Sequence, residues 1–154
     1  MISKLIVGIV TAGLLFTQAA FAGRATDGTV KIIYWQAPST LNPFLSGGTK
    51  DVESASMIIE PLARYNQDGE MLPFLAKEVP TVANGGVSSD LTSITWTLRD
   101  DILWSDGTPF TSADVKFTAD YCMHPEGGCA QMSKFGGVTS VEAMGDYKVK
   151  ITFD

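Results

Sequence analysis

The sequence predicts a mixed α/β fold that is rich in strands, and three patterns support this prediction. Apolar and polar residues alternate at positions 93–99 and again at 147–153, with the period of strands that bury one face. Thr111 stands three residues before Asp114 at the start of a partly apolar segment, which is the pattern of a capped helix. Between the first of these strands and the helix, residues 105–107 (Ser-Asp-Gly) predict a tight turn.

The length and composition of the chain limit its fold and its partners. Its 154 residues are enough for one small domain with its own core, and 45% of them are hydrophobic, which excludes a disordered chain. The formal net charge is −6, and the lysines and arginines form no cluster. Nucleic acid and anionic membrane surfaces are therefore not expected as partners.

Residues 1–22 have the organisation of a secretory signal peptide. Lys4 supplies positive charge, residues 5–16 form a short apolar run, and residues 20–22 (Ala-Phe-Ala) provide a cleavage site. We therefore expect export and cleavage after Ala22. The apolar run is too short to favour a membrane span, although an uncleaved N-terminal anchor is the alternative, and no cysteine follows that could carry a lipid.

The first elements after this segment are predicted from apolar runs, prolines and capping residues. Residues 30–35 are apolar almost throughout, which predicts a strand buried on both faces. Two prolines make residues 36–43 a loop. Residues 49–60 fit a helix that Thr49 can cap, with Asp51 in its first turn, where an acid favours the helix dipole.

A first hairpin and a helical turn are predicted in the middle of the chain. Residues 62–65 and 70–72 flank a turn that ends at Gly69, which is typical of a hairpin. Proline at the first position then predicts a helical turn at residues 73–78.

Two further hairpins are predicted on either side of the central helix. In the first of them, residues 81–83 pair with the strand at 94–99 across a long glycine-rich tip. In the other, apolar and polar residues alternate at 138–143 and at 147–153, on both sides of a short turn that contains glycine.

The two cysteines are predicted to form a disulfide. The predicted helix has an apolar side formed by Val115, Phe117, Ala119 and Cys122. Cys122 and Cys129 are the only cysteines of a chain that we expect to be exported, and the proline and glycines between them let the chain turn back. Free thiols, or a metal bound together with His124, are the alternatives, but this spacing matches no familiar zinc site.

Three nearby aspartates invite a catalytic or metal-binding interpretation, which the sequence favours less than a structural one. Asp100, Asp101 and Asp106 match no calcium loop, and no nucleophile or second histidine accompanies them. Asp106 is better explained by turn chemistry, and Asp100 as a neighbour or partner of Arg99.

The aromatic residues divide into core candidates and one contact candidate. Trp96 and Trp104 could stack on a ligand, but their positions in and just after a strand favour core packing. Phe135 precedes two glycines in a segment without strong periodicity, and is therefore the aromatic residue considered for a ligand contact.

The segment around the central helix resembles the signature of the family 5 solute-binding proteins, which are receptors of peptide and nickel ABC importers. The residues that carry the resemblance, for which we expect structural roles, are Trp96, Leu98, Arg99, Asp100, Trp104, Asp106, Gly107, Pro109, Phe110, Thr111, Asp114, Val115 and Phe117. The resemblance extends from about Val30 to the last residue. In the family a Pro-x-Leu-Ala segment usually leads into a tryptophan, whereas Val79 and Pro80 stand there in this chain, so the match is weaker at this point.

The resemblance implies the N-terminal portion of a two-lobed fold of the periplasmic binding protein type II kind. It divides the chain into the signal peptide at 1–22, the first strand and loop of the large lobe at 23–48, and the small strand-rich lobe at 49–154. Family members are several hundred residues long, so we expect the chain to be truncated at Asp154, within its last strand.

The resemblance also implies a function. The chain is expected to belong to the periplasmic substrate-binding component of an ABC transporter, which binds a peptide ligand and docks on ABC permease subunits at the inner membrane. A monomer with no cofactor, no metal and no catalytic residues is expected, retained in the periplasm of a Gram-negative cell. The alternatives are a nickel or oligosaccharide receptor, a secreted hydrolase, and a peptide sensor without a transport role.

The candidate ligand contacts follow from the same resemblance. In the family the chain leaves its first strand beside the ligand cleft, so Gln36, Ala37, Pro38 and Ser39 are expected to approach the ligand. Phe135 is expected to be an aromatic contact in the same cleft. Because most of the cleft of such a receptor lies beyond these residues, we expect the 154-residue chain not to bind peptide by itself.

Overall fold

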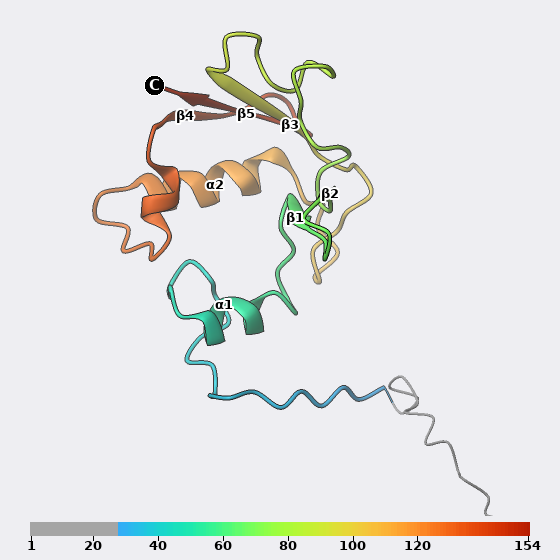
Figure 1. Ribbon diagram of the computed structural model, residues 1–154, viewed down its shortest axis with the longest axis vertical. Coiled ribbons are helices and arrows are strands. Elements are labelled where there is room, and N and C mark those ends of the chain that lie inside the picture. Colours follow the sequence, from blue (N-terminus) through green and yellow to red (C-terminus); the bar gives the residue numbers. More distant parts are fainter. Residues whose placement is uncertain (1–27) are drawn as a thin grey trace, which may run out of the picture. The chain divides into compact units, whose positions relative to one another are not determined.

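The structure confirms the predicted mixed, strand-rich α/β class. The computed structural model describes residues 28–154, so the predicted signal peptide lies outside the described residues. The chain divides into two units, residues 1–33 and 34–154. In chain order the described elements are α1 (Thr49–Ala55), β1 (Ala63–Tyr65), β2 (Met71–Pro73), β3 (Ser93–Thr97), α2 (Ser112–Met123), the short 3-10 helix η1 (Met132–Phe135), β4 (Val138–Ala143) and β5 (Lys148–Phe153) (Figure 1). None of the helices in residues 28–154 is long and apolar enough to cross a membrane.

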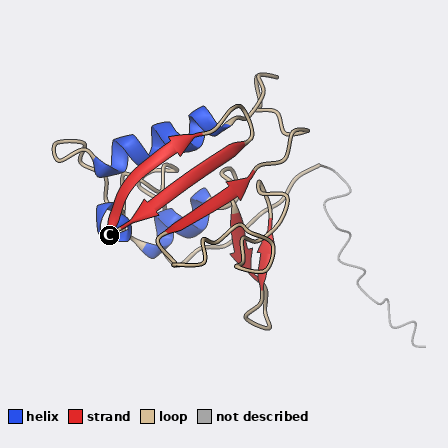
Figure 2. Ribbon diagram, turned by 90° about the horizontal axis from the view of Figure 1, so that it is seen from above, coloured by secondary structure: helices blue, strands red, loops and turns tan. Residues whose placement is uncertain are grey.

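A three-stranded antiparallel sheet is the larger of the two sheets. Its strand order is β3-β5-β4, so β5 lies in the middle, with Ile151 opposite Ile94 on one side and opposite Val141 on the other. The third predicted hairpin is therefore confirmed as β4 and β5. Helix α2 packs against one face of this sheet, mainly against β4 (Figure 2).

The core lies between α2 and this face of the sheet. Its buried members come from five different segments and are Leu98, Phe110, Ala119, Val141 and Val149. Leu98 has no exposed surface although it follows the last residue of β3, and its N–H donates to the carbonyl of Tyr147 at 2.8 Å. The motif residues Leu98 and Phe110 thus bring the strand, the turn and the helix into one apolar cluster.

Helix α2 begins as the sequence predicts, but one residue on its expected apolar side is exposed. The N–H of Thr111 donates to Oδ2 of Asp114 at 2.7 Å, which completes the capping box. Ser112 is buried, and its N–H donates to the carbonyl of Asp146 at 2.8 Å, which joins the helix start to the β4–β5 turn. The expectation was wrong for Phe117, which is 73% exposed because this helix buries only a narrow stripe that includes Ala119.

The β1–β2 hairpin is confirmed, whereas the helical turn predicted after it is absent. Gly69 ends the hairpin turn with φ +81°, a left-handed conformation that favours glycine. Pro73 is the last residue of β2, and residues 74–78 form no helical turn. Instead, Ala76 bridges Leu98 in antiparallel fashion. Pairing with a distant segment has overridden the local preference of proline for a helix start.

The second hairpin forms, but with a different partner segment from the one predicted. Residues 81–83 lie in a turn, in which Oδ1 of Asn84 accepts from the N–H of Thr81 at 2.8 Å. The segment that meets β3 begins later, where Val87 bridges Ile94 and the carbonyl of Gly86 accepts from the N–H of Thr95. The N–H of Thr81 is therefore bonded to Asn84 within this turn and not to β3.

Residues 30–35 do not form the buried strand that their composition predicts. They lie outside every strand of the described chain, Ile33 is 99% exposed and Trp35 is 72% exposed. An apolar run is buried only where a neighbouring strand or helix covers it. The composition of residues 30–35 does not show whether such a neighbouring strand or helix is present.

Helix α1 is shorter than predicted and starts without a side-chain cap. It ends at Ala55 rather than at residue 60, and turns follow up to Ile58. Gly48 occupies the capping position with no capping hydrogen bond from a side chain, so the expectation that Thr49 caps the helix was wrong. The buried side chains of the helix are Asp51 and Ala55.

The predicted disulfide is present. Cys122 at the end of α2 is bonded to Cys129, seven positions along the chain, and both residues are buried. His124 lies in the loop that the bond closes, and its Nδ1 accepts from the N–H of Glu126 at 3.1 Å. The alternatives of free thiols and of a metal bound by these cysteines are thereby excluded.

Candidate functional site

The four residues predicted to approach a ligand lie in the loop at residues 36–48, between the exposed segment 30–35 and α1. The side chains of Gln36, Ala37, Pro38 and Ser39 are all exposed. As predicted, this loop contains no helix and no strand. The side chains are therefore accessible, and the contacts that fix the loop come from elsewhere.

The carboxylate of Asp51 contacts this loop from the first turn of α1. Its Oδ1 accepts from the N–H of Ser39 at 2.6 Å and from the N–H of Thr40 at 3.4 Å, and its Oδ2 accepts from the hydroxyl of Ser46 at 2.7 Å. Nζ of Lys50 lies 3.0 Å from Oδ1 and also donates to the hydroxyl of Ser39. The hydrogen bonds from Ser46 and Ser39 hold the pKa of Asp51 well below its ordinary value, so this carboxylate is ionised.

A second set of contacts joins the far end of the loop to the segment after the disulfide. Nε2 of Gln131 donates to the carbonyls of Pro43 and Ser46, at 3.2 and 3.1 Å. The N–H of Ala130 donates to the carbonyl of Phe44 at 2.8 Å. The loop is thus connected both to α1 and to the segment that Cys129 begins.

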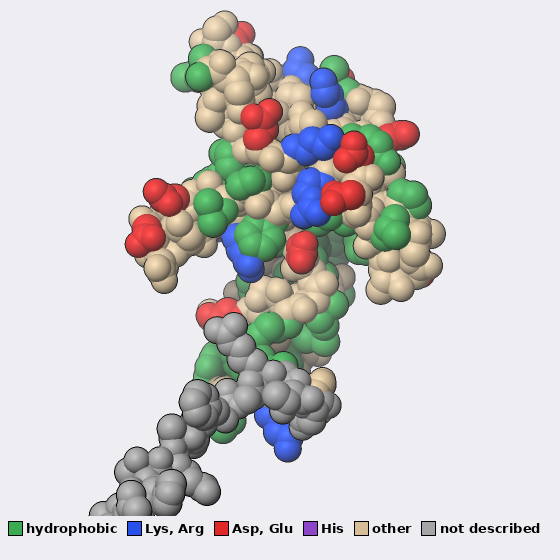
Figure 3. Space-filling model, turned by 90° about the vertical axis from the view of Figure 1, so that its right-hand side faces the viewer, with side chains coloured by type: hydrophobic (Ala, Val, Ile, Leu, Met, Phe, Trp, Pro, Cys, Tyr) green, Lys and Arg blue, Asp and Glu red, His purple; other side chains and the backbone are tan. Residues whose placement is uncertain are grey.

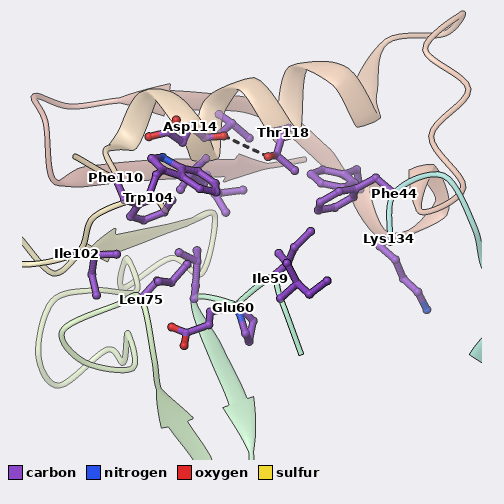
Figure 4. Close-up of a pocket in the computed structure, with 18 of the residues that line it drawn as sticks. Phe44, Ile59, Glu60, Leu75, Ile102, Trp104, Phe110, Asp114, Thr118 and Lys134 are labelled. Carbon is purple, nitrogen blue, oxygen red and sulfur yellow. Dashed lines mark hydrogen bonds between the residues drawn. The ribbon is translucent and has the colours of Figure 1, made fainter. Parts of the chain in front are cut away.

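A large apolar hollow opens beside α2 and the sheet. Its volume is about 910 Å³, and aromatic and aliphatic side chains from α2, β4, β5 and the turns form most of its wall (Figure 4). The apolar side chains in this wall include Phe44, Ile59, Leu75, Ile102, Trp104, Phe110, Val115, Phe135, Val141 and Ile151, and the charged ones are Glu60, Asp101, Asp114 and Lys134. We call this feature the apolar hollow.

The structure places the predicted contact residues in two different locations. Phe135, the last residue of η1, contributes to the wall of the apolar hollow and is half-buried. None of the residues at 36–39 contributes to that wall, although Phe44 from the same loop does. The described chain therefore does not bring Phe135 and Ser39 together in one pocket.

Most motif residues contact other parts of the chain rather than an open site. The rings of Trp104 and Phe110 meet edge to face, with centroids 5.8 Å apart. Gly107 adopts φ +87° in the predicted turn, and Oδ1 of Asp106 accepts from the N–H and hydroxyl of Thr108. Residues 109–111 then lead directly into α2, with Pro109 bridging Leu103.

Two expectations for individual motif residues need correction. Arg99 pairs with Asp101, with Nη2 2.8 Å from Oδ2, whereas Asp100 pairs with Lys77 at 3.1 Å. These partners lower the pKa of each aspartate. Trp96 is half-buried in β3, as expected for packing, but Trp104 is 47% exposed because one side of its ring faces the apolar hollow.

The described surface carries mixed charges. Basic and acidic side chains lie next to one another on the face shown in Figure 3. Two ion pairs of the described chain are Lys77–Asp100 and Arg99–Asp101. Within residues 28–154, no group of three His, Cys, Asp or Glu side chains lies close enough together to hold a metal ion.

Sequence reasoning missed Asp51 and Gln131, the two side chains that fix the loop. The sequence indicates Asp51 only as an acid favourable to the helix dipole, and it indicates no role for Gln131. An acid close to two loop serines is a weak local pattern for such a role. Gln131 lies more than 80 positions from its partners, and a single sequence contains no pattern for that contact.

Comparison with known proteins places the chain among bacterial binding proteins. A family profile described as "Bacterial extracellular solute-binding proteins, family 5 Middle" matches residues 70–154. The chain is 29% identical over 113 residues to the periplasmic murein peptide-binding protein MppA of Escherichia coli K12, an alignment that covers 72% of this chain and 20% of that protein. It is 28% identical over 131 residues to the oligopeptide-binding protein OppA of Bacillus subtilis 168, covering 76% of this chain and 23% of that protein.

A solved structure shows the same arrangement of elements. NikZ from Campylobacter jejuni, in complex with Ni(L-His), superposes with a TM-score of 0.65 and 28% sequence identity, covering 77% of this chain and 22% of NikZ. The chain therefore spans less than a quarter of the length of each of these three relatives.

Proposed function

We propose, from the premise that this chain belongs to the bacterial extracellular solute-binding proteins of family 5, that it forms part of the periplasmic substrate-binding component of an ABC transporter that imports peptides. The match over residues 70–154 is the observation that carries this proposal. The names of MppA and OppA, a murein peptide-binding and an oligopeptide-binding protein, support peptides as the ligand class.

In this proposal the chain contributes the N-terminal part of a two-lobed receptor. Residues 23–48 belong to the large lobe, with Gln36, Ala37, Pro38 and Ser39 next to the ligand, and residues 49–154 form the small lobe. The ligand contact predicted for Phe135 is not part of the proposal, because this side chain lies in the wall of the apolar hollow. A receptor of this kind closes its lobes over the ligand, and only the closed form presents both docking faces to the permease subunits. Peptide main chains are held by strand-like hydrogen bonds, while water-filled pockets accept varied side chains.

The apolar hollow supports the expectation that the 154-residue chain does not bind peptide by itself. A hollow of about 910 Å³ with an apolar wall is a packing surface rather than a polar peptide site. The relatives are far longer than this chain, so we propose that further polypeptide completes both the core and the cleft. We assign no catalytic role to any residue, and we propose that the receptor acts as a monomer in the periplasm.

The proposal is tested by ligand-dependent stability of the gene product at its natural length. Trialanine, pentaalanine, Ni²⁺ with L-histidine, and maltotriose are each added in excess, and the melting temperature is measured. A ligand at about 100 times its Kd stabilises by about 2.7 kcal/mol, which a melting curve resolves readily. We expect a shift with at least one peptide. A shift only with the nickel complex or the sugar would overturn the peptide assignment in favour of those receptors.

Two further measurements separate the classes of function. Uptake of a labelled peptide into an importer-deficient strain that expresses the gene and its permease distinguishes transport from sensing, and we expect uptake. Turnover of a chromogenic ester or amide panel would instead show a secreted hydrolase and would overturn the receptor proposal. Calorimetry of the 154-residue chain with trialanine should detect no binding, and micromolar binding would contradict the expected incompleteness.

A further inference from the structure

We propose that Asp51 is a positioning residue, whose carboxylate fixes the backbone at Ser39 and Thr40 and so presets the segment at residues 36–39 before any ligand arrives. Only the ligand contact of that segment rests on the proposed function. The positioning itself rests on the geometry of the described residues.

The environment of the Asp51 carboxylate determines what this group can contact. Asp51 is 2% exposed, although burial of a charged group is costly unless hydrogen bonds compensate it. Both oxygens have donors, with Ser39 N–H and Lys50 Nζ at Oδ1 and the Ser46 hydroxyl at Oδ2. A carboxylate that is buried and fully engaged by its own chain does not contact ligand, and acts by holding the groups bonded to it.

The backbone of the loop depends on its contact with Asp51. Residues 36–48 form no helix and no strand, so their N–H groups lack the partners that regular structure would supply. Asp51 supplies an acceptor to two successive N–H groups, those of Ser39 and Thr40. Hydrogen bonds to an ionised acceptor are about twice as strong as those between neutral groups. The backbone at these two positions is therefore fixed mainly by one side chain.

This arrangement leaves the side chains of the segment accessible. The side chains at 36–39 are exposed while the backbone of Ser39 is bonded to a buried group. Lys50 extends the arrangement, because its Nζ contacts both Asp51 and the Ser39 hydroxyl. A segment with a fixed backbone and accessible side chains loses little conformational freedom on binding, which favours affinity.

Amide hydrogen exchange, measured by NMR on the 154-residue chain, tests the positioning role directly. In the Asp51→Asn variant, the N–H groups of Ser39 and Thr40 should exchange about tenfold faster, because a charge-assisted acceptor is lost. The N–H of Leu98, which is bonded to Tyr147 in the core, should not change. Unchanged exchange at Ser39, or equal acceleration at Ser39 and Leu98, would overturn the proposal, since the second result would indicate general destabilisation.

Two measurements keep the test decisive if this variant folds poorly. In the unmodified chain, the Ser39 amide proton should resonate downfield of the other loop amides, and an ordinary position would contradict the short charge-assisted bond. The Ser46→Ala variant removes a donor to Oδ2 and leaves the Ser39 contact at Oδ1 in place. It should therefore accelerate exchange at Ser39 less than Asp51→Asn does, and an equal effect would contradict the role assigned to Oδ1.

The functional consequence is measured separately on the gene product at its natural length. Trialanine is the probe, and Asp51→Asn should weaken its binding about tenfold by the loss of a preset backbone. Ser56→Ala is the matched control, since the Ser56 hydroxyl donates to the backbone carbonyl of Glu53 and not to Asp51 or the loop, and it should leave the affinity unchanged. If the unmodified protein does not bind trialanine, this result contradicts the assignment of trialanine as a ligand. The hydrogen-exchange result still decides the role of Asp51.

Discussion

Breaking the Cys122–Cys129 bond should lower the free energy of unfolding by about 2.5 kcal/mol. The two cysteines lie seven positions apart, and the loop-entropy relation gives this value for a closed loop of about eight residues. Against a typical total of about 5 to 15 kcal/mol for a domain, this is a large share. Because both sulfurs are buried, replacing them with alanine also removes packed atoms, which should cost about 1 kcal/mol more.

The assay is urea unfolding followed by circular dichroism, on the oxidised chain, the chain reduced with a phosphine, and the Cys122→Ala/Cys129→Ala double variant. Reduction keeps both sulfurs in place and therefore isolates the effect of the cross-link on the unfolded chain. We expect the oxidised chain to be the most stable and the double variant the least stable. If the oxidised and reduced chains differ by less than about 0.5 kcal/mol, the loop-entropy reasoning is refuted for this bond.

Three further outcomes are expected. Thr111→Ala should destabilise the chain by about 1 kcal/mol in the same urea assay through loss of the helix cap, and an unchanged midpoint would argue against the capping box. Gly107→Ala should cost about 1 to 2 kcal/mol, because its φ of +87° strains any residue with a Cβ, whereas Gly47→Ala, in open space without a positive φ, should be nearly neutral. The lowered pKa of Asp51 means that its stabilising contribution is complete above the ordinary carboxyl pKa of about 3.9 and is lost as the pH falls through the lower folded value. Asp51→Asn should therefore lose less stability than the unmodified chain between about pH 6 and about pH 3, and parallel pH profiles would contradict this assignment.

The features predicted correctly from the sequence are those that depend on neighbours along the chain. The β4–β5 hairpin follows from strict alternation on both sides of a glycine turn, and the capping box of α2 follows from two residues three positions apart. The disulfide follows from two cysteines close together in a chain that is expected to be exported. In each case the partner lies no more than 15 positions away along the chain, so a local pattern contains the whole interaction.

The predictions that were wrong depend on partners distant in the sequence. Pro73 favours a helix start locally, but Ala76 pairs with Leu98 more than 20 positions away. Residues 30–35 have the composition of a buried strand, yet burial requires covering elements that composition does not specify. The same limit explains Phe117, which is apolar but lies outside the stripe of α2 that faces the sheet.

For the candidate site, the ligand contacts at residues 36–39 stay a prediction, and the sequence did not indicate the residues that shape this loop. The resemblance directed attention to the loop at 36–39, and the structure shows these side chains exposed. It did not indicate Asp51, because an acid in a first helical turn already has an ordinary explanation in the helix dipole. It also did not indicate that Phe135 belongs to the apolar hollow rather than to the neighbourhood of Ser39.

The contacts of Gln131 have a consequence for the order in which the chain folds. Its amide joins Pro43 and Ser46 across separations of 88 and 85 positions, so the intervening chain must be confined before these bonds can form. The hairpins and α2 have close partners and can form earlier. In refolding experiments, protection at the Ala130 N–H, which is bonded to Phe44, should therefore develop after protection within β4 and β5. Until these bonds form, the loop at residues 36–48 lacks its contacts with Gln131 and Ala130 and should be open to proteases and chaperones.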